Sequence, residues 1–82
     1  MDTTVDITVR LFAAYADALG ASHTIVRVPE PATVGTLRTA LASLSSRLPP
    51  RPIIAVNAEY AADEQRITER DEVAVIPPVS GG

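Results

Sequence analysis

The stretch that decides the fold is residues 33–48, TVGTLRTALASLSSRL, which carries the most regular hydrophobic pattern in the chain. Its apolar side chains recur at spacings of three and four residues, which places them on one stripe of a helix. Because an isolated helix of this length is marginal in water, the stripe is expected to pack against a sheet. The stripe consists of Val34, Leu37, Leu41, Leu44 and Leu48.

Both ends of this helix have recognisable signals. Thr33 is expected to be the N-cap, because its side-chain oxygen can accept from an amide of the first turn. The acidic residue that usually completes a capping box is missing, since Thr36 stands at that position. Pro49-Pro50 is expected to end the helix, because proline lacks the amide hydrogen that a helix needs.

Two strands are predicted before the helix. Residues 5–11 alternate apolar and polar side chains, which indicates a strand with one buried face. Residues 23–28 are rich in β-branched side chains and precede Pro29, so they form the second strand. Between them, residues 13–19 are predicted to form a short helix that Gly20 ends.

Two or three strands are predicted after the main helix. Residues 53–56 are all apolar, and a tight turn at residues 57–59 leads into Tyr60. A polar loop and a turn at residues 68–71 then precede a last strand at residues 72–76. The order β-β-α-β-β predicts an α+β domain, with a mixed sheet of four to five strands packed by one main α-helix.

Composition narrows the possible functions. The chain has 82 residues, no cysteine and a formal net charge of −3, and its seven basic residues, all arginine, are scattered. A single small domain is therefore expected, without disulfides, thiolate metal sites or a catalytic thiol. Nucleic-acid binding is not expected, because it needs a concentrated basic face. No apolar run approaches the ~20 residues of a membrane span, so a cytoplasmic protein without membrane contact is expected.

The side chains offer no convincing catalytic group. His23 is the only histidine and lies in a predicted strand, where a structural or solvent-facing role is typical. Three serines, at positions 43, 45 and 46, have no neighbouring base, and the acidic residues lack the spacing of a cation-binding loop. The chain is therefore predicted to be non-catalytic alone and to bind no metal.

The last six residues, PPVSGG, form a distinctive tail. Gly81 and Gly82 have no Cβ, so they can enter a channel too narrow for a side chain. Pro77 and Pro78 favour an extended path that would hold the tip, with Val79 and Ser80, away from the folded body. We therefore expect a folded domain at residues 1–78 and a flexible tail at residues 79–82.

Several segments together resemble a known family. They are Val9-Arg10-Leu11-Phe12-Ala13, Ala55-Val56-Asn57, Glu59-Tyr60 and the block from Asp71 to Gly82, DEVAVIPPVSGG. In these segments the chain is similar to the molybdopterin synthase small subunits, which are sulfur carriers with the ubiquitin-like β-grasp fold. One departure is Arg70, where the family often has glycine, so a different local backbone is expected in that turn.

The resemblance implies a function for the tail. An adenylating enzyme would use ATP to form a transient AMP adduct at Gly82, and sulfur from a donor protein would then give a thiocarboxylate. Residues Pro77, Pro78, Val79, Ser80 and Gly81 would bind in a large catalytic subunit, within a heterotetramer of two copies of each chain. That subunit would transfer the sulfur to a cyclic pyranopterin monophosphate precursor in molybdenum cofactor biosynthesis. No permanently bound cofactor is implied, and exposed apolar groups of the sheet near the tail are the expected partner surface.

Three other functions fit the tail. The chain could carry sulfur for thiamin or cysteine biosynthesis, although Pro77-Pro78-Val79-Ser80 favours molybdopterin. It could be a ubiquitin-like modifier that is joined through Gly82 to target lysines. It could also be an interaction domain with an inert tail.

Overall fold

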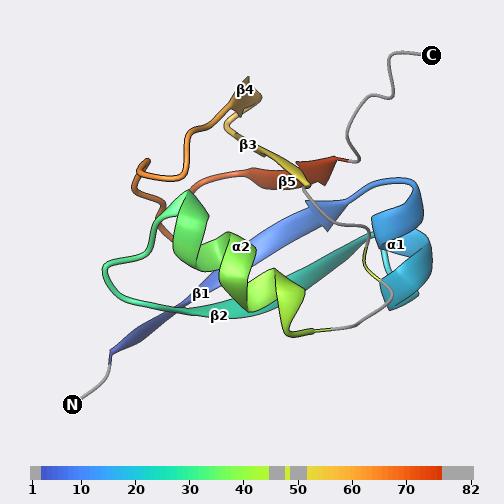
Figure 1. The fold of residues 1–82 in the computed structure, drawn as a ribbon, viewed down its shortest axis with the longest axis horizontal. Coiled ribbons are helices and arrows are strands. Elements are labelled where there is room, and N and C mark those ends of the chain that lie inside the picture. The colour runs from blue at the N-terminus through green and yellow to red at the C-terminus, as the bar shows by residue number, and fades with distance from the viewer. Residues whose placement is uncertain (1–2, 45–47, 49–51, 77–82) are drawn as a thin grey trace.

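The predicted α+β architecture is confirmed by a computed structural model that describes residues 3–44, 48 and 52–76. Five strands form one mixed sheet in the order β2-β1-β5-β3-β4, and the longer helix packs on one of its faces (Figure 1). β1 and β5 are parallel neighbours, whereas the other strand pairs are antiparallel. The elements are β1 (Thr4–Leu11), α1 (Ala14–Leu19), β2 (His23–Pro29), α2 (Val34–Ala42), β3 (Ile53–Val56), β4 (Glu59–Tyr60) and β5 (Val73–Ile76).

The first two strands pair without a bulge along their whole length. Their register runs from Thr4 opposite Pro29 to Arg10 opposite His23. The connection is the predicted short helix α1, and its Tyr15 is only 2% exposed. Gly20 ends α1 in the left-handed conformation (φ 67°), and its amide donates to the carbonyl of Ala16, which confirms the predicted cap.

The start of α2 corrects one expectation. The Thr33 side chain accepts from the Thr36 amide at 3.2 Å, while the Thr36 hydroxyl accepts from the Thr33 amide at 2.8 Å. A capping box therefore forms without an acidic residue, because a threonine oxygen is close enough to take the place of the carboxylate. The next amides are also satisfied, since Val34 donates to the Gln65 carbonyl and Gly35 to the Asp63 carbonyl.

The end of α2 corrects a second expectation from the sequence. The helix stops at Ala42, so the predicted continuation of the leucine stripe is wrong from residue 43. Ser43 directs both its amide and its hydroxyl to the Ala40 carbonyl, which tightens the last turn and competes with further helix. Leu44 is consequently 46% exposed, and Leu48 is half-buried beyond the helix. Residues 45–47 lie outside the described part of the chain.

The hydrophobic core lies between the sheet and α2. Within the described residues, no charged or polar side chain is buried. Buried and more exposed residues alternate along β1, β2 and β5, so that one side of these strands is covered by α2 and the other faces outward. The core members are Ile7, Val9, Leu11, Tyr15, Val26, Val28, Ala32, Val34, Leu37, Leu41, Ile54, Val56, Ile67, Val73 and Val75.

A hydrogen-bonded cluster joins the β3–β4 turn to the turn before β5. Asn57 and Ala58 both have positive φ, at 52° and 68°, as in a two-residue hairpin of type I′. The Asn57 side chain accepts from the Glu72 amide at 2.9 Å and donates to Asp71 Oδ1 at 3.1 Å. The predicted turn at residues 68–71 is closed by a hydrogen bond from the Asp71 amide to the Thr68 carbonyl. Arg70 is not among the residues with positive φ, as expected for a non-glycine residue.

Among the described residues, no helix is both long and apolar enough to cross a lipid bilayer.

Candidate functional site

The predicted site residues Pro77, Pro78, Val79, Ser80, Gly81 and Gly82 all lie outside the described part of the chain. The structure does describe the surface from which they continue. β5 ends at Ile76, directly before Pro77, and Val75 pairs with Leu11 at the end of β1. Residue 77 therefore follows the end of β5, which lies beside the end of β1 in the sheet (Figure 1).

An apolar patch lies on the outer face of the sheet at this end. Residues opposite one another in antiparallel strands share a face, and here Ile53 lies opposite Ile76, and Ala55 opposite Ala74 and Tyr60. Their neighbours along the strands, such as Ile54 and Val75, belong to the core, so this set points away from α2. Together with Phe12, we call it the tail-side patch: Phe12, Ile53, Ala55, Tyr60, Ala74 and Ile76, of which Ala55 is only 5% exposed beneath its neighbours.

The two aromatic side chains are the most exposed members of the patch. Tyr60 is 77% exposed and Phe12 is 40% exposed. The Arg10 guanidinium lies 5.5 Å from the centroid of the Phe12 ring, which confirms that Phe12 is on the outer face beside Arg10. Arg10 also pairs with Glu72 at 3.1 Å. The patch therefore combines aromatic surface with one arginine at its border.

A strained turn holds Phe12 in this position. Ala13 has φ 51° and ψ −124°, which is the first central position of a type II′ turn and normally favours glycine. The turn closes through the Tyr15 amide, which donates to the Phe12 carbonyl at 3.1 Å. Such a conformation costs an L-residue roughly 1–3 kcal/mol, and strain of this kind tends to be kept at functional positions.

Among the described residues, two side chains have a shifted pKa, Asp71 and Tyr15. The amide of Asn57, followed by the backbone amide of Thr68, holds the pKa of Asp71 below its ordinary value. Burial raises the pKa of the Tyr15 phenol above its ordinary value. His23 is exposed, with Nδ1 3.2 Å from the Ser22 hydroxyl. Within residues 3–44, 48 and 52–76, no group of three potential metal ligands comes together.

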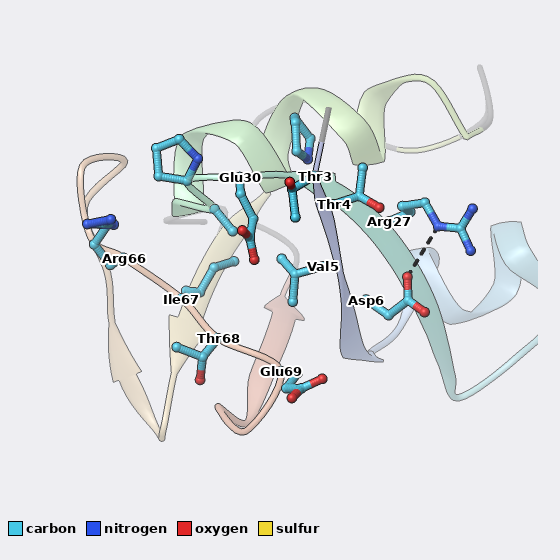
Figure 2. Close-up of a pocket in the computed structure, with 13 residues that line it drawn as sticks. Thr3, Thr4, Val5, Asp6, Arg27, Glu30, Arg66, Ile67, Thr68 and Glu69 are labelled. Atoms are coloured by element: carbon cyan, nitrogen blue, oxygen red, sulfur yellow. Dashed lines mark hydrogen bonds and ion pairs between the residues drawn. The ribbon is translucent and has the colours of Figure 1, made fainter. Parts of the chain in front are cut away.

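An open hollow lies at the opposite end of the sheet, and sequence reasoning did not predict it. It has a volume of about 1250 Å³ and lies between the start of β1, the segment after β2 and residues 66–69 (Figure 2). Its lining mixes carboxylates and guanidinium groups, and Figure 2 shows Arg27 directed to Asp6, with Nε 3.3 Å from Oδ1. Because its lining carries charges of both signs and it is open to solvent, the hollow favours no class of ligand.

Known proteins share both the sequence and the fold of this chain. The profile of the ThiS family matches residues 9–82. A protein of Arabidopsis thaliana named molybdopterin synthase sulfur carrier subunit is 31% identical, over 98% of this chain and 86% of its own length. These matches cover the predicted tail as well as the folded domain.

Several solved structures are similar to this chain. The putative molybdopterin converting factor subunit 1 of Pyrococcus furiosus superposes with a TM-score of 0.80 at 24% identity, over 92% of this chain and 99% of that one. Small archaeal modifier protein 1 of Haloferax volcanii has a TM-score of 0.69 at 31% identity, with coverages of 92% and 99%. The strand order and these likenesses establish the ubiquitin-like β-grasp fold, and the match over residues 9–82 shows that the chain belongs to the ThiS family.

Proposed function

We propose that this chain is the sulfur-carrier subunit of a molybdopterin synthase, and that the α-carboxyl group of Gly82 carries the sulfur. The observation that carries the proposal is the similarity, over 98% of the chain, to a relative that bears this name. The family match also runs to Gly82. The absence of cysteine is compatible with this role, because the sulfur would be held on the main chain.

The proposed chemistry has two activation steps. A carboxylate oxygen of Gly82 attacks the α-phosphorus of ATP, so that pyrophosphate leaves and an acyl adenylate forms. A sulfur nucleophile at the oxidation level of hydrosulfide, supplied by a donor protein, then adds to the acyl carbon, and AMP leaves with the oxygen. This order is required because a carboxylate resists nucleophiles until one oxygen has become part of a good leaving group.

The same proposal assigns a role to the tail-side patch. The six residues after Ile76 can span at most about 20 Å, so a protein that binds the tip must also lie close to the end of β5. The exposed aromatic side chains Phe12 and Tyr60 are of the type that anchors protein interfaces. We therefore propose that the large catalytic subunit covers this patch while it receives residues 77–82.

The proposed assembly contains two copies of each subunit, and the general acid-base groups belong to the large subunit. The pyranopterin precursor would bind there, and this chain would supply only the thiocarboxylate. The activating enzyme would contact the same tail in a separate complex. These encounters would take place in the cytoplasm.

A second candidate is a ubiquitin-like protein modifier, which the 31% identity to small archaeal modifier protein 1 favours. In this function the acyl adenylate reacts with a lysine of a target protein instead of a sulfur nucleophile. Because this chain contains no lysine, such a modifier could not extend itself through side-chain isopeptide bonds. Both candidates use the same activated carboxyl group and differ in the nucleophile.

Intact-mass spectrometry separates the two functions. The purified chain is incubated with an activating enzyme, ATP and a sulfide source, with and without added cellular protein. A sulfur carrier gains the mass difference between sulfur and oxygen, whereas a modifier gives covalent adducts with other proteins. An unchanged mass, with an enzyme that activates a known family member in parallel, contradicts both.

Removal of Gly82 provides the matched control. The shortened chain should form no thiocarboxylate and support no sulfur transfer, while its circular-dichroism spectrum and unfolding midpoint remain those of the full chain. Replacing Gly81 by a bulky residue should leave the fold unchanged and prevent entry into a narrow pocket. Loss of the folded spectrum on deletion of Gly82 would contradict the assignment of the tail as separate from the core.

A further inference from the structure

β2 is the outermost strand of the sheet on the side away from β3 and β4. Its pairing with β1 reveals which backbone groups face outward. Leu11 donates to the Ser22 carbonyl at 2.8 Å, and Glu30 donates to the Thr3 carbonyl at 2.9 Å. In the continuous register between them, β2 residues with even numbers bond to β1, so the backbone groups of residues 23, 25 and 27 point to the open edge.

These edge groups have no partner among the described residues. No hydrogen bond from the amide or carbonyl of His23, Ile25 or Arg27 is found within residues 3–44, 48 and 52–76. Natural proteins usually protect such an edge with charged side chains, prolines, a bulge or a very short strand. β2 has seven residues and no bulge, its Arg27 is paired with Asp6 of the same chain, and its proline stands at the last position, Pro29. Its central outward side chain, Ile25, is 63% exposed.

We propose that β2 pairs with β2 of a second copy of this chain, in an antiparallel arrangement with the two-fold axis at Ile25. The free groups recur at positions 23, 25 and 27, so they are symmetric about Ile25. In this register residue 25 faces its own copy, and residue 23 faces residue 27 of the other chain. Each such pair can form two hydrogen bonds, and the two five-stranded sheets become one continuous sheet.

The side chains are compatible with this register. The two Ile25 side chains meet on the outer face and remove apolar surface from water. Arg27 is held by Asp6 of its own chain at 3.3 Å, so its charge is already balanced where it faces His23 of the copy. Pro29, which has no amide hydrogen, marks the end of the pairing segment. A second copy of the edge therefore satisfies the donors and acceptors of residues 23, 25 and 27.

The dimer is expected to be weak and reversible. The contact area is limited to two short edges, below the roughly 1,200–2,000 Å² of a stable interface. A dissociation constant of the order of 10⁻⁴ to 10⁻³ M is expected. β2 and β5 are separated by β1, so pairing at β2 leaves the tail-side patch uncovered. The inference is thus independent of the proposed sulfur-carrier function.

A cysteine scan tests the register directly, because the natural chain contains no cysteine. In the proposed dimer the two copies of residue 25 have Cα atoms about 5.5 Å apart, which is within disulfide range. Thr8 is the matched control, since it lies opposite Ile25 on β1 and is also exposed. Its two copies would be three strand spacings apart, or about 14 Å, which is too far for a disulfide.

Under mild oxidation, Ile25→Cys should give disulfide-linked dimers at least tenfold faster than Thr8→Cys, at the same protein concentration. Equal rates for the two variants would overturn the proposal. Sedimentation velocity of the unmodified chain supplies a second measurement. Concentration-dependent dimerisation should be abolished by Ile25→Lys and retained by Thr8→Lys, and a chain that stays monomeric at millimolar concentration would also overturn the proposal.

Discussion

Ala13 has a backbone conformation that L-residues rarely adopt, with φ 51° and ψ −124°. It joins β1 to α1, so its geometry sets the direction in which Phe12 leaves the central strand. A glycine there would reach the same conformation without a Cβ clash. Alanine at this position therefore carries backbone strain beside the tail-side patch.

Ala13→Gly should raise the free energy of unfolding by roughly 0.5–1 kcal/mol. The relief of backbone strain should exceed the cost of the additional conformational entropy that the glycine variant loses on folding. The matched control is Ala18→Gly within α1, which should lower stability by about 0.5–1 kcal/mol, since its conformation is helical. Urea unfolding monitored by circular dichroism measures both. A loss of stability in both variants would show that Ala13 carries no relievable strain.

Asp71 gives a prediction about pH. The Asn57 amide and the Thr68 backbone amide favour the carboxylate, so the pKa of Asp71 is lowered in the folded state. A lowered folded-state pKa contributes stability that is present above the ordinary value of 3.8 and is lost as pH falls through the folded value. Unfolding free energies measured from pH 6 down to about 2 should therefore fall less steeply in Asp71→Asn than in the natural chain. Parallel curves would contradict this.

The hydrogen bonds of several single residues could not be predicted from the sequence. Thr36 was expected to leave the capping box incomplete, because the usual pattern requires a long acidic or amide side chain. Its hydroxyl nevertheless lies 2.8 Å from the Thr33 amide. The link from Asn57 to Asp71 joins residues 14 positions apart, so no local pattern could indicate it.

At the scale of elements, α2 shows that a periodic pattern of apolar residues does not mean that every one of them is buried. Leu37 and Leu41 are buried against the sheet, whereas Leu44, at the next position of the same stripe, is 46% exposed. Periodicity alone predicted that all would be equivalent. The difference arises because α2 ends at Ala42, where Ser43 binds the Ala40 carbonyl, so that Leu44 lies beyond the helix.

Two alanine substitutions quantify this difference. Leu41→Ala should lower the free energy of unfolding by roughly 2–5 kcal/mol, since it leaves a cavity in a closely packed core. Leu44→Ala should change it by less than about 0.5–1 kcal/mol, because the side chain is already partly in water. Chemical denaturation compares the two directly. Equal losses would mean that Leu44 packs against the core after all.

The elements themselves were largely predictable, but their arrangement was not. Alternation at residues 5–11 and β-branched residues at 23–28 indicated strands, because one face of each must be buried. The pairing of β1 with β5 joins residue 9 to residue 73, which no local signal specifies. It was supplied by the resemblance to the β-grasp fold. The tail-side patch was foreseen only as exposed apolar groups near the tail, since its members come from four separate segments.

At the scale of the whole molecule, the outer face of the sheet has two distinct regions. The tail-side patch occupies β3, β4 and the end of β5, while Ile25 lies on the opposite edge strand. Polar side chains of β1, among them Thr8, lie between these regions. One molecule can therefore meet a catalytic subunit at one side and a second copy at the other.

Tyr60→Asp should weaken binding of the large subunit about tenfold or more, because an exposed aromatic anchor is replaced by a charge that must lose its water. Thr8→Asp, on the same face but outside the patch, should bind within about twofold of the natural chain, since peripheral substitutions cost little. Isothermal titration calorimetry with the large subunit measures both affinities. Unfolding midpoints close to that of the natural chain confirm that each variant is folded, and equal affinities would remove the patch from the interface.

The parallel pairing of β1 with β5 has a consequence for biosynthesis. β1 lies between β2 and β5, so one edge of β1 has no neighbour until residues 73–76 have been made. During synthesis the sheet can close only after β5 has left the ribosome. Chains that terminate before β5 would remain unfolded and accessible to proteases.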